Sequence, residues 1–400
     1  MKVNFPLVSV VIPAYNAEAF IGKTLKSVLS QTYQNIEVLV VDDGSLDTTA
    51  EIIKSFAEKD SRVILLRQPN SGVAAARNFA IEKSKGEYIA PIDADDIWYS
   101  QKLEKQVQCM LEADPTVGLV YAWSAFIDAE DNIIGDYTSF HYLNIRSIEG
   151  YVYPAMIQMN LIGNGSVPLI RRSCFDKIGL YNCKLREQNA QGCEDWDIYL
   201  RIAEAYQFRV VPEFLIGYRQ LKGSMSRCYG AMAKSYDLVM ANSKRRRPDI
   251  PTYIYNWSAS DFYTYILTIS LEHKDYGSTF LWLSRAIKLD LFRLLQIWIY
   301  KCYFTCIVKI LSTKIINLIL PKHDFIQGTK NNYPEHTEDI TVEQIKTVAD
   351  IQKEMLKPQE IPRKPYAKIR WQRWLYTVKL CRSLSYTETN SKNEIVSKIC

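Results

Sequence analysis

Three carboxylates, Asp93, Asp95 and Asp96, follow an apolar run in "IAPIDADDIWY", residues 89–99. Clustered acids repel one another and lose solvation when they are buried, so a metal ion, a basic side chain or water is expected between them. In an extended segment Asp93 and Asp95 point to one side and Ala94 to the other. Two carboxylates on one side suit a hard divalent cation, Mg²⁺ or Mn²⁺.

A second group of acids begins "GCEDWDIYLRIAEA", residues 192–205, whose spaced aliphatic residues predict an amphipathic helix. Glu194, Asp195 and Asp197 fall in its first turn, where acids are favourable even without a catalytic purpose. That plain interpretation fits Asp197 best. The charge of Glu194 would raise the proton affinity of Asp195, which suits a general base.

The elements that must position these acids are short strands alternating with helices. Four runs rich in aliphatic residues predict strands at residues 7–13, 36–44, 62–68 and 86–93. A helix-length segment follows each run, which predicts an α/β fold with a mostly parallel sheet and helices on both faces. Ligands bind such sheets beyond the carboxyl ends of the strands. Polar residues stand at each of these ends: Tyr15 and Asn16, Asp42 and Asp43, Asn70–Gly72, and Asp93–Asp96.

The chain has 400 residues, more than one ordinary core accommodates, so we expect several regions. The sequence predicts an α/β domain over residues 1–226, a helical region over 227–320 and a polar, basic, partly disordered extension over 321–400. Residues 1–226 carry 22 basic and 28 acidic side chains, and residues 227–400 carry 27 and 16. We therefore expect the two halves to meet different partners.

Cysteine usage and the N-terminus indicate a cytoplasmic protein. Nine cysteines form no CxxC pair, and an odd number of them favours reduced thiols. The first residues, "MKVNFPLVSVVIPAYN", do not have the pattern of a secretion signal. We expect the chain either free in the cytoplasm or on the inner face of the membrane.

The segment 291–320 is strongly apolar but is interrupted by basic residues: Arg293, Lys301, Lys309 and Lys314. No uncharged stretch in it reaches the roughly 18 residues of a spanning helix. It is either an amphipathic helix in peripheral contact with an anionic membrane surface or a helix packed against the first domain. A basic aromatic patch at 363–379 is typical of a solvated or membrane-facing surface, so no nucleic acid is expected as a partner.

Five stretches occur in an informative order: "VSVVIPAYN", "VDDGSLDTT", "NSGVAAARN", "IDADD" and "EDWDIYLRIA". Their order and spacing resemble those of family 2 glycosyltransferases over roughly residues 7–226. The resemblance implies the GT-A fold that binds nucleoside diphosphate-sugars, transfer of the sugar, usually with inversion, and a divalent metal, Mn²⁺ or Mg²⁺. The stretch 163–173 resembles the part that shapes the acceptor side.

The resemblance also implies roles for individual residues. The donor site would comprise Pro13, Tyr15, Glu18, Asp43, Asn70, Gly72, Arg77, Asp93 and Ala94. Asp95 would be the principal metal ligand, with Asp93 beside it, and Asp195 would be the base. On the acceptor side we expect Glu194 and Trp196, whose ring could stack on a sugar.

Several of these residues have a plainer alternative. Asp43 could cap the following helix, and Arg77 could simply pair with a carboxylate. Asp96 is expected to cap a helix that begins near Trp98. Many relatives have a histidine in a late "YRxH" stretch where this chain has Leu221, so water or phosphate oxygens would complete the metal shell. Other phosphate partners expected on that loop are Arg219, Lys222 and Ser224.

The sequence thus predicts a glycosyltransferase that moves a sugar from a nucleoside diphosphate-sugar, UDP-linked or other, to a hydroxyl of a glycan or lipid-linked carrier. The reaction would be a metal-assisted, inverting single displacement. The alternative is a catalytically inactive nucleotide-sugar-binding or scaffold protein of the same fold. The presence of Asp43, Asp95 and Asp195 favours the enzyme, because a binding module needs no base.

Overall fold

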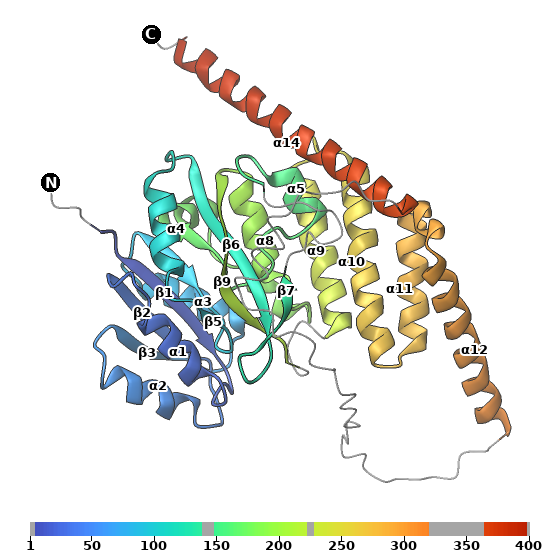
Figure 1. The fold of residues 1–400 in the computed structure, drawn as a ribbon, viewed down its shortest axis with the longest axis horizontal. Coiled ribbons are helices and arrows are strands. Elements are labelled where there is room, and N and C mark those ends of the chain that lie inside the picture. The colour runs from blue at the N-terminus through green and yellow to red at the C-terminus, as the bar shows by residue number, and fades with distance from the viewer. Residues whose placement is uncertain (1–4, 138–147, 222–227, 320–363, 398–400) are drawn as a thin grey trace. The chain divides into compact units, whose positions relative to one another are not determined.

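The computed structural model describes residues 5–137, 148–221, 228–319 and 364–397, with side chains described to residue 135 in the first range, 312 in the third and 384 in the fourth. The chain forms two compact units (Figure 1). One contains residues 1–258 and 347–400, and the other contains residues 259–346. The domain bounds expected from the sequence stay predictions, and the expected disorder within 321–363 lies outside the described residues.

The larger unit is built on a nine-stranded sheet whose N-terminal part is parallel. In the order β3-β2-β1-β4, its strands are β3 (Val63–Arg67), β2 (Ile36–Asp42), β1 (Val8–Ala14) and β4 (Tyr88–Pro91). β1 pairs on both edges and is buried along its whole length. Its sequence is therefore a continuous apolar run and not an alternating one.

Three helices follow the first three strands, as the sequence predicts (Figure 1). They are α1 (Ile21–Leu29), α2 (Thr49–Ala57) and α3 (Val73–Lys83). In α1 the buried residues are Ile21, Thr24, Leu25 and Val28. This spacing of three and four residues places them on one helical face. The carboxyl ends of the parallel strands and the N-termini of these helices consequently share one edge of the sheet.

The remaining strands make the sheet mixed. They are β8 (Leu169–Arg171), β6 (Val117–Ile127), β9 (Gln207–Arg219), β5 (Ile97–Trp98) and β7 (Ile133–Tyr137). β8 is antiparallel to both β4 and β6, whereas β6 and β9 run parallel along most of their length. The α/β class and the helical C-terminal part are confirmed, and parallel pairing joins the first four strands to one another and β6 to β9.

In the part of the chain that the structure describes, the larger unit also contains α4 (Lys102–Leu111), α5 (Tyr153–Gln158), α6 (Arg172–Ile178), α7 (Lys184–Glu187), α8 (Glu194–Ala203), α9 (Tyr229–Arg246) and α14 (Pro365–Ser397). The last of these, red in Figure 1, packs against α5 through a buried row that includes Trp374, Thr377 and Cys381. The spacing of three and four residues in this row is that of one helical face. A segment far along the chain therefore completes the core of the α/β unit.

The smaller unit contains most of α10 (Thr252–Glu272), together with α11 (Tyr276–Leu289), η2 (Leu291–Leu295) and α12 (Ile297–Ile319). Tyr263 stacks on Trp282 with ring centroids 5.4 Å apart. Arg293 is buried and pairs with Asp261, which neutralises its charge. None of the described helices combines the length and apolar character needed to cross a membrane.

Candidate functional site

The loops after β1 and β2 are held together at the carboxyl edge of the sheet. Glu18 accepts hydrogen bonds from the Thr48 N–H at 3.0 Å and the Thr48 hydroxyl at 2.7 Å. Pro13 is buried in β1, where it pairs with Val41 of β2, so it supports the loop that follows β1. Tyr15, by contrast, is 48% exposed, which leaves its ring open at this edge.

Asp43 is buried at the end of β2 and organises the loop that precedes α3. Its Oδ1 accepts from the Gln68 Nε2–H at 2.7 Å and the Ser71 N–H at 2.8 Å, and its Oδ2 accepts from the Gly72 N–H at 2.7 Å. The alternative of a helix cap is therefore wrong for Asp43, since Asp47 accepts from the Thr49 N–H at the start of α2. Gly72 has φ 90°, a backbone conformation that favours glycine.

Arg77 in α3 is the central cation of the site. Its guanidinium is 2% exposed and donates to Asp93 at 2.5 Å and to Glu194 at 3.4 Å. The guanidinium also lies over the ring of Tyr181, 5.3 Å from its centroid. Asp93, the largest favourable influence, and Glu194 outweigh the effect of burial, so the pKa of Arg77 stays well above its usual range. Arg77 thereby connects the D-A-D-D segment to the first turn of α8.

The close contact of Arg77 with Asp93 requires a glycine at position 165. A Cβ placed on Gly165 would lie 2.4 Å from Arg77 Nη2, which is closer than real contacts allow, and 3.0 Å from Asp93 Oδ2, which is tighter than most of them. The next residue, Ser166, accepts from the Asp93 N–H at 2.9 Å and donates from its hydroxyl to Asp96. The segment 163–166 therefore fixes the D-A-D-D backbone from the opposite side.

Within D-A-D-D the three acids have different surroundings. Burial and then the charge of Asp93 raise the pKa of Asp95 to about 6. Among the described residues, the Asp95 carboxylate has no ion-pair partner. Ala94 is buried, and its carbonyl accepts from the Thr24 hydroxyl at 2.9 Å.

Asp96 does not have the expected capping role. It is fully buried, and it accepts from the Ser166 hydroxyl and, at 2.8 Å, from the Arg219 N–H. Burial, followed by the charges of the other two acids, raises its pKa well above the usual range. The residues near Trp98 form the short strand β5, and α4 begins only at Lys102, so there is no helix for Asp96 to cap.

The structure also corrects the expectation that Arg219 would be a phosphate partner. Its side chain is buried and donates to the Asp95 carbonyl at 2.6 Å, and it pairs with Asp131. It lies over the ring of Phe20, 4.7 Å from the centroid. Arg219 therefore stabilises the D-A-D-D backbone from within the fold. The other two expected partners, Lys222 and Ser224, lie outside the described residues.

The first turn of α8 carries the candidate base. Burial, followed by the charge of Glu194, raises the pKa of Asp195 to about 7, while Arg77 opposes the change. Glu194 itself accepts from the Gly192 N–H at 3.1 Å in addition to its contact with Arg77. Asp197 instead pairs with Arg201 at 2.9 Å, the structural role that the sequence favoured for it.

Trp196 occupies the core. It is 7% exposed, its indole N–H donates to the Met156 carbonyl at 2.7 Å, and its ring lies 5.4 Å from that of Tyr236. A sugar cannot stack on a ring whose faces are covered by protein. Trp196 is therefore a packing residue in this structure and presents no platform for an acceptor.

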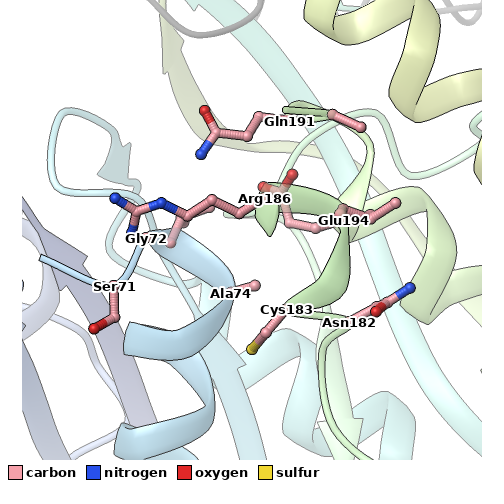
Figure 2. Close-up of a pocket in the computed structure, with 11 residues that line it drawn as sticks. Ser71, Gly72, Ala74, Asn182, Cys183, Arg186, Gln191 and Glu194 are labelled. Carbon is pink, nitrogen blue, oxygen red and sulfur yellow. The ribbon is translucent and has the colours of Figure 1, made fainter. Parts of the chain in front are cut away.

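A pocket with about 270 Å³ of empty space, part of which is open solvent, lies beside this cluster (Figure 2). The loop before α3 lines one side through Ser71 and Gly72, and the segment that leads into α8 lines the other side through Arg186 and Glu194. In Figure 2, Arg186 extends from this segment toward Gly72, and its Nη2 donates to Asn70 Oδ1 at 2.5 Å. Residues more than a hundred positions apart in the sequence thus form one cavity.

Comparison with known proteins identifies the family. The model of the family "Glycosyl transferase family 2" matches residues 9–161. An uncharacterised glycosyltransferase of Methanocaldococcus jannaschii, MJ1057, is 31% identical over 222 residues, which are 54% of this chain and 72% of that protein. The chain belongs to glycosyltransferase family 2.

Other relatives of this family 2 glycosyltransferase match shorter parts. An uncharacterised glycosyltransferase of Haemophilus influenzae is 45% identical over 132 residues, 33% of this chain and 52% of that protein. One from Rickettsia bellii is 34% identical over 198 residues, 49% of this chain and 26% of its own length. The mannosyltransferase PcManGT of Pyrobaculum calidifontis, solved with GDP-Man and Mn²⁺, aligns with TM-score 0.48 and 20% identity, over 78% of this chain and 89% of that one.

In this family 2 glycosyltransferase, Asp93 and Asp95 form a pair of carboxylates that suits a divalent cation. Among the described residues, no group of three or more His, Cys, Asp and Glu side chains is arranged around a metal position. Asp93 and Asp95 nevertheless repel one another, since the charge of Asp93 adds to the effect of burial in raising the pKa of Asp95. A cation between them would remove this repulsion, and two carboxylates leave positions for diphosphate oxygens and water.

Sequence reasoning missed four members of the site: Gly165, Ser166, Tyr181 and Arg186. Gly165 and Ser166 belong to the stretch 163–173, which the resemblance connected only with the acceptor side. Tyr181 and Arg186 lie in an irregular segment whose contacts depend on the fold, so periodicity gave no signal for them.

Proposed function

We propose that the chain transfers a sugar from a nucleoside diphosphate-sugar, UDP-linked or other, to a hydroxyl of a glycan or lipid-linked carrier. One observation carries the proposal: buried Arg77 pairs with Asp93 of the D-A-D-D segment and with Glu194 beside the candidate base. Donor-side and acceptor-side acids are thereby brought to one place. The name shared by the curated relatives, glycosyltransferase, supports the same class of reaction.

Asp195 is the proposed general base of an inverting single displacement. Its carboxylate takes the proton of the acceptor hydroxyl while the hydroxyl oxygen attacks the anomeric carbon. The bond from that carbon to the diphosphate oxygen breaks, and its electron pair leaves with the nucleoside diphosphate. A pKa near 7 suits a base that accepts a proton at neutral pH.

The donor would lie along the carboxyl edge of the parallel strands. The open ring of Tyr15 can stack on a nucleobase, and Asp43 keeps lone pairs on Oδ2 for a base N–H beyond its bond to Gly72. Asn70 is exposed on the same loop. The roles proposed for Pro13, Glu18 and Ala94 are to hold this edge in shape, which agrees with their internal contacts.

Asp93 and Asp95 would hold Mn²⁺ or Mg²⁺. When bound there, the cation would neutralise the negative charge that the departing diphosphate accumulates. Asp93 is already oriented by Arg77, so Asp95 is the carboxylate with more freedom to bind a ligand. Leu221 offers no ligand atom, and water or phosphate oxygens would complete the coordination shell.

We also propose that the protein works in the cytoplasm, which is supported by eight described cysteines that are all free. The second candidate function is an inactive nucleotide-sugar-binding or scaffold protein. The raised pKa of Asp195 favours the enzyme, because a protein that only binds its ligand does not need a carboxyl group with a pKa near 7.

A panel of nucleotide sugars tests the proposal. Thermal shift with and without Mn²⁺ identifies the donor, and release of the nucleoside diphosphate measures transfer or hydrolysis. We expect one donor to stabilise the protein and to be consumed in a reaction that EDTA stops. Binding without any turnover, across acceptors, would instead identify the scaffold protein. Release of pyrophosphate from nucleoside triphosphates would identify a nucleotidyltransferase.

A further inference from the structure

The helix α12 exposes a row of large apolar side chains, here named the apolar stripe. It consists of Ile297, Tyr300, Phe304, Ile307, Val308 and Leu311. Ile297 is 75% exposed and Phe304 is 71% exposed, so these are not side chains at the margin of a core. Just before the helix, Leu291 and Phe292 of η2 are also more than half exposed. Contiguous exposed apolar surface of this kind marks an interaction site.

The apolar stripe is one face of α12, separate from the face that packs. Apart from the adjacent pair Ile307 and Val308, its successive members are three or four residues apart, and all six lie within an arc of about 100° on the helix. Ile299, Cys302 and Cys306 are buried on the other side of the helix, where it packs against α11. Tyr303 belongs to that contact, since its hydroxyl lies 2.7 Å from the Ser284 hydroxyl. Internal packing therefore explains one apolar face and not the other.

The charges around the apolar stripe have one sign. The segment 291–319 contains four basic residues and no acidic residue. Arg293 is buried against Asp261, whereas Lys301 is exposed at the edge of the apolar stripe, and Lys309 is exposed about 100° further round the helix from that edge. Long lysine side chains at such positions can place their ammonium groups in a polar layer while their stems contact apolar surface. This arrangement complements a surface that is anionic outside and apolar below.

We propose that the apolar stripe docks on an anionic lipid bilayer, with α12 lying in the plane of the interface. The apolar side chains would enter the boundary between headgroups and acyl chains, and Lys301 at the edge of the apolar stripe would contact lipid phosphates. Trp298 and Tyr300 are aromatic residues of the kind that favours this boundary. The proposal does not depend on the catalytic function, because lipid binding is measured without a sugar donor.

Charge also decides against a second copy of the chain as the occupant. In a two-fold contact the apolar stripe would face itself, and the flanking lysines of both copies would lie close together. The segment 291–319 supplies no acid to pair with them. Such a contact would carry like-charge repulsion that an anionic bilayer replaces with attraction.

Co-sedimentation of the full chain with vesicles tests the proposal. We expect binding to phosphatidylcholine mixed with phosphatidylglycerol, much weaker binding to phosphatidylcholine alone, and weakening by salt. The double variant Phe304→Glu with Leu311→Glu should bind at least about tenfold more weakly. The matched control is Leu111→Glu with Ile134→Glu, which adds the same charge at positions 52% and 57% exposed outside the apolar stripe. It should bind like wild type.

Thermal unfolding of both variants checks that the substitutions leave the fold intact, as expected for exposed side chains. Equal loss of vesicle binding in the two double variants would overturn the proposal, because charge alone would then explain the loss. Failure of the wild-type chain to bind anionic vesicles would overturn it as well. A dimer that only the Phe304 and Leu311 substitutions dissociate, without vesicle binding, would assign the apolar stripe to self-association instead.

Discussion

The substitution Asp195→Asn should make the protein more stable at alkaline pH while it removes the base. Burial and Glu194 raise the pKa of Asp195 from 3.8 to about 7 in the folded state. Between these values the unfolded chain loses the proton and the folded chain keeps it, so the stability of wild type falls as pH rises. Above pH 7 the loss of unfolding free energy in wild type is constant, and below pH 4 there is no such loss. Asparagine carries no such cost at any pH.

The pKa difference sets an upper bound on the effect. At about 1.4 kcal/mol per pH unit, it corresponds to about 4 kcal/mol of unfolding free energy. The side chain is partly exposed, and Glu194 responds to the same substitution, so we expect about 1–2 kcal/mol at pH 8. For a domain of this size that is roughly 2–6 °C in the thermal midpoint.

The assay is thermal unfolding of wild type and Asp195→Asn at several values between pH 5 and pH 8. The gap in midpoint should widen as pH rises and level off above pH 7. Asp60→Asn is the opposite control, because the hydrogen bonds from Arg62 lower the pKa of Asp60 and its loss should destabilise the fold. A gap for Asp195→Asn that does not change with pH, or that reverses at pH 8, would refute the reasoning.

Three further substitutions test other parts of the site. Gly165→Ala would place a Cβ 2.4 Å from Arg77 Nη2, so transfer should fall at least about tenfold and the thermal midpoint should drop. Gly22→Ala in α1, whose Cβ would have its nearest neighbour at 3.9 Å, should leave transfer unchanged and should not lower the thermal midpoint. Asp43→Asn removes an acceptor for the loop amides, so calorimetry should find donor affinity about tenfold weaker, and an unchanged affinity would exclude that role. Asp95→Asn should shift the Mn²⁺ titration of activity to higher concentration, and an unchanged titration would place the metal elsewhere.

Much of the α/β half was predictable because its signals are local. The strands β1 and β2 are mostly apolar, and the buried spacing in α1 is that of one helical face. From these strands and helices it could be predicted that the polar residues at the strand ends lie at one edge of the sheet. The first turn of α8 was likewise predictable from its acids and spaced aliphatic residues.

The remaining features depend on contacts between distant segments. Asp96 appeared to be a helix cap because its partners, Ser166 and the Arg219 N–H, are remote in sequence. Trp196 appeared available because burial by Met156 and Tyr236 leaves no local pattern. Sequence periodicity reports one element at a time and gives no account of what covers it.

The most direct test of the account compares Asp195→Asn with wild type for transfer and donor binding in the same preparation. Turnover should fall by roughly 10² to 10⁴, because the acceptor hydroxyl loses its base. Donor affinity should stay nearly unchanged, because the proposed donor contacts lie on other residues. Wild-type turnover in Asp195→Asn would contradict the central claim and remove this carboxylate from the mechanism.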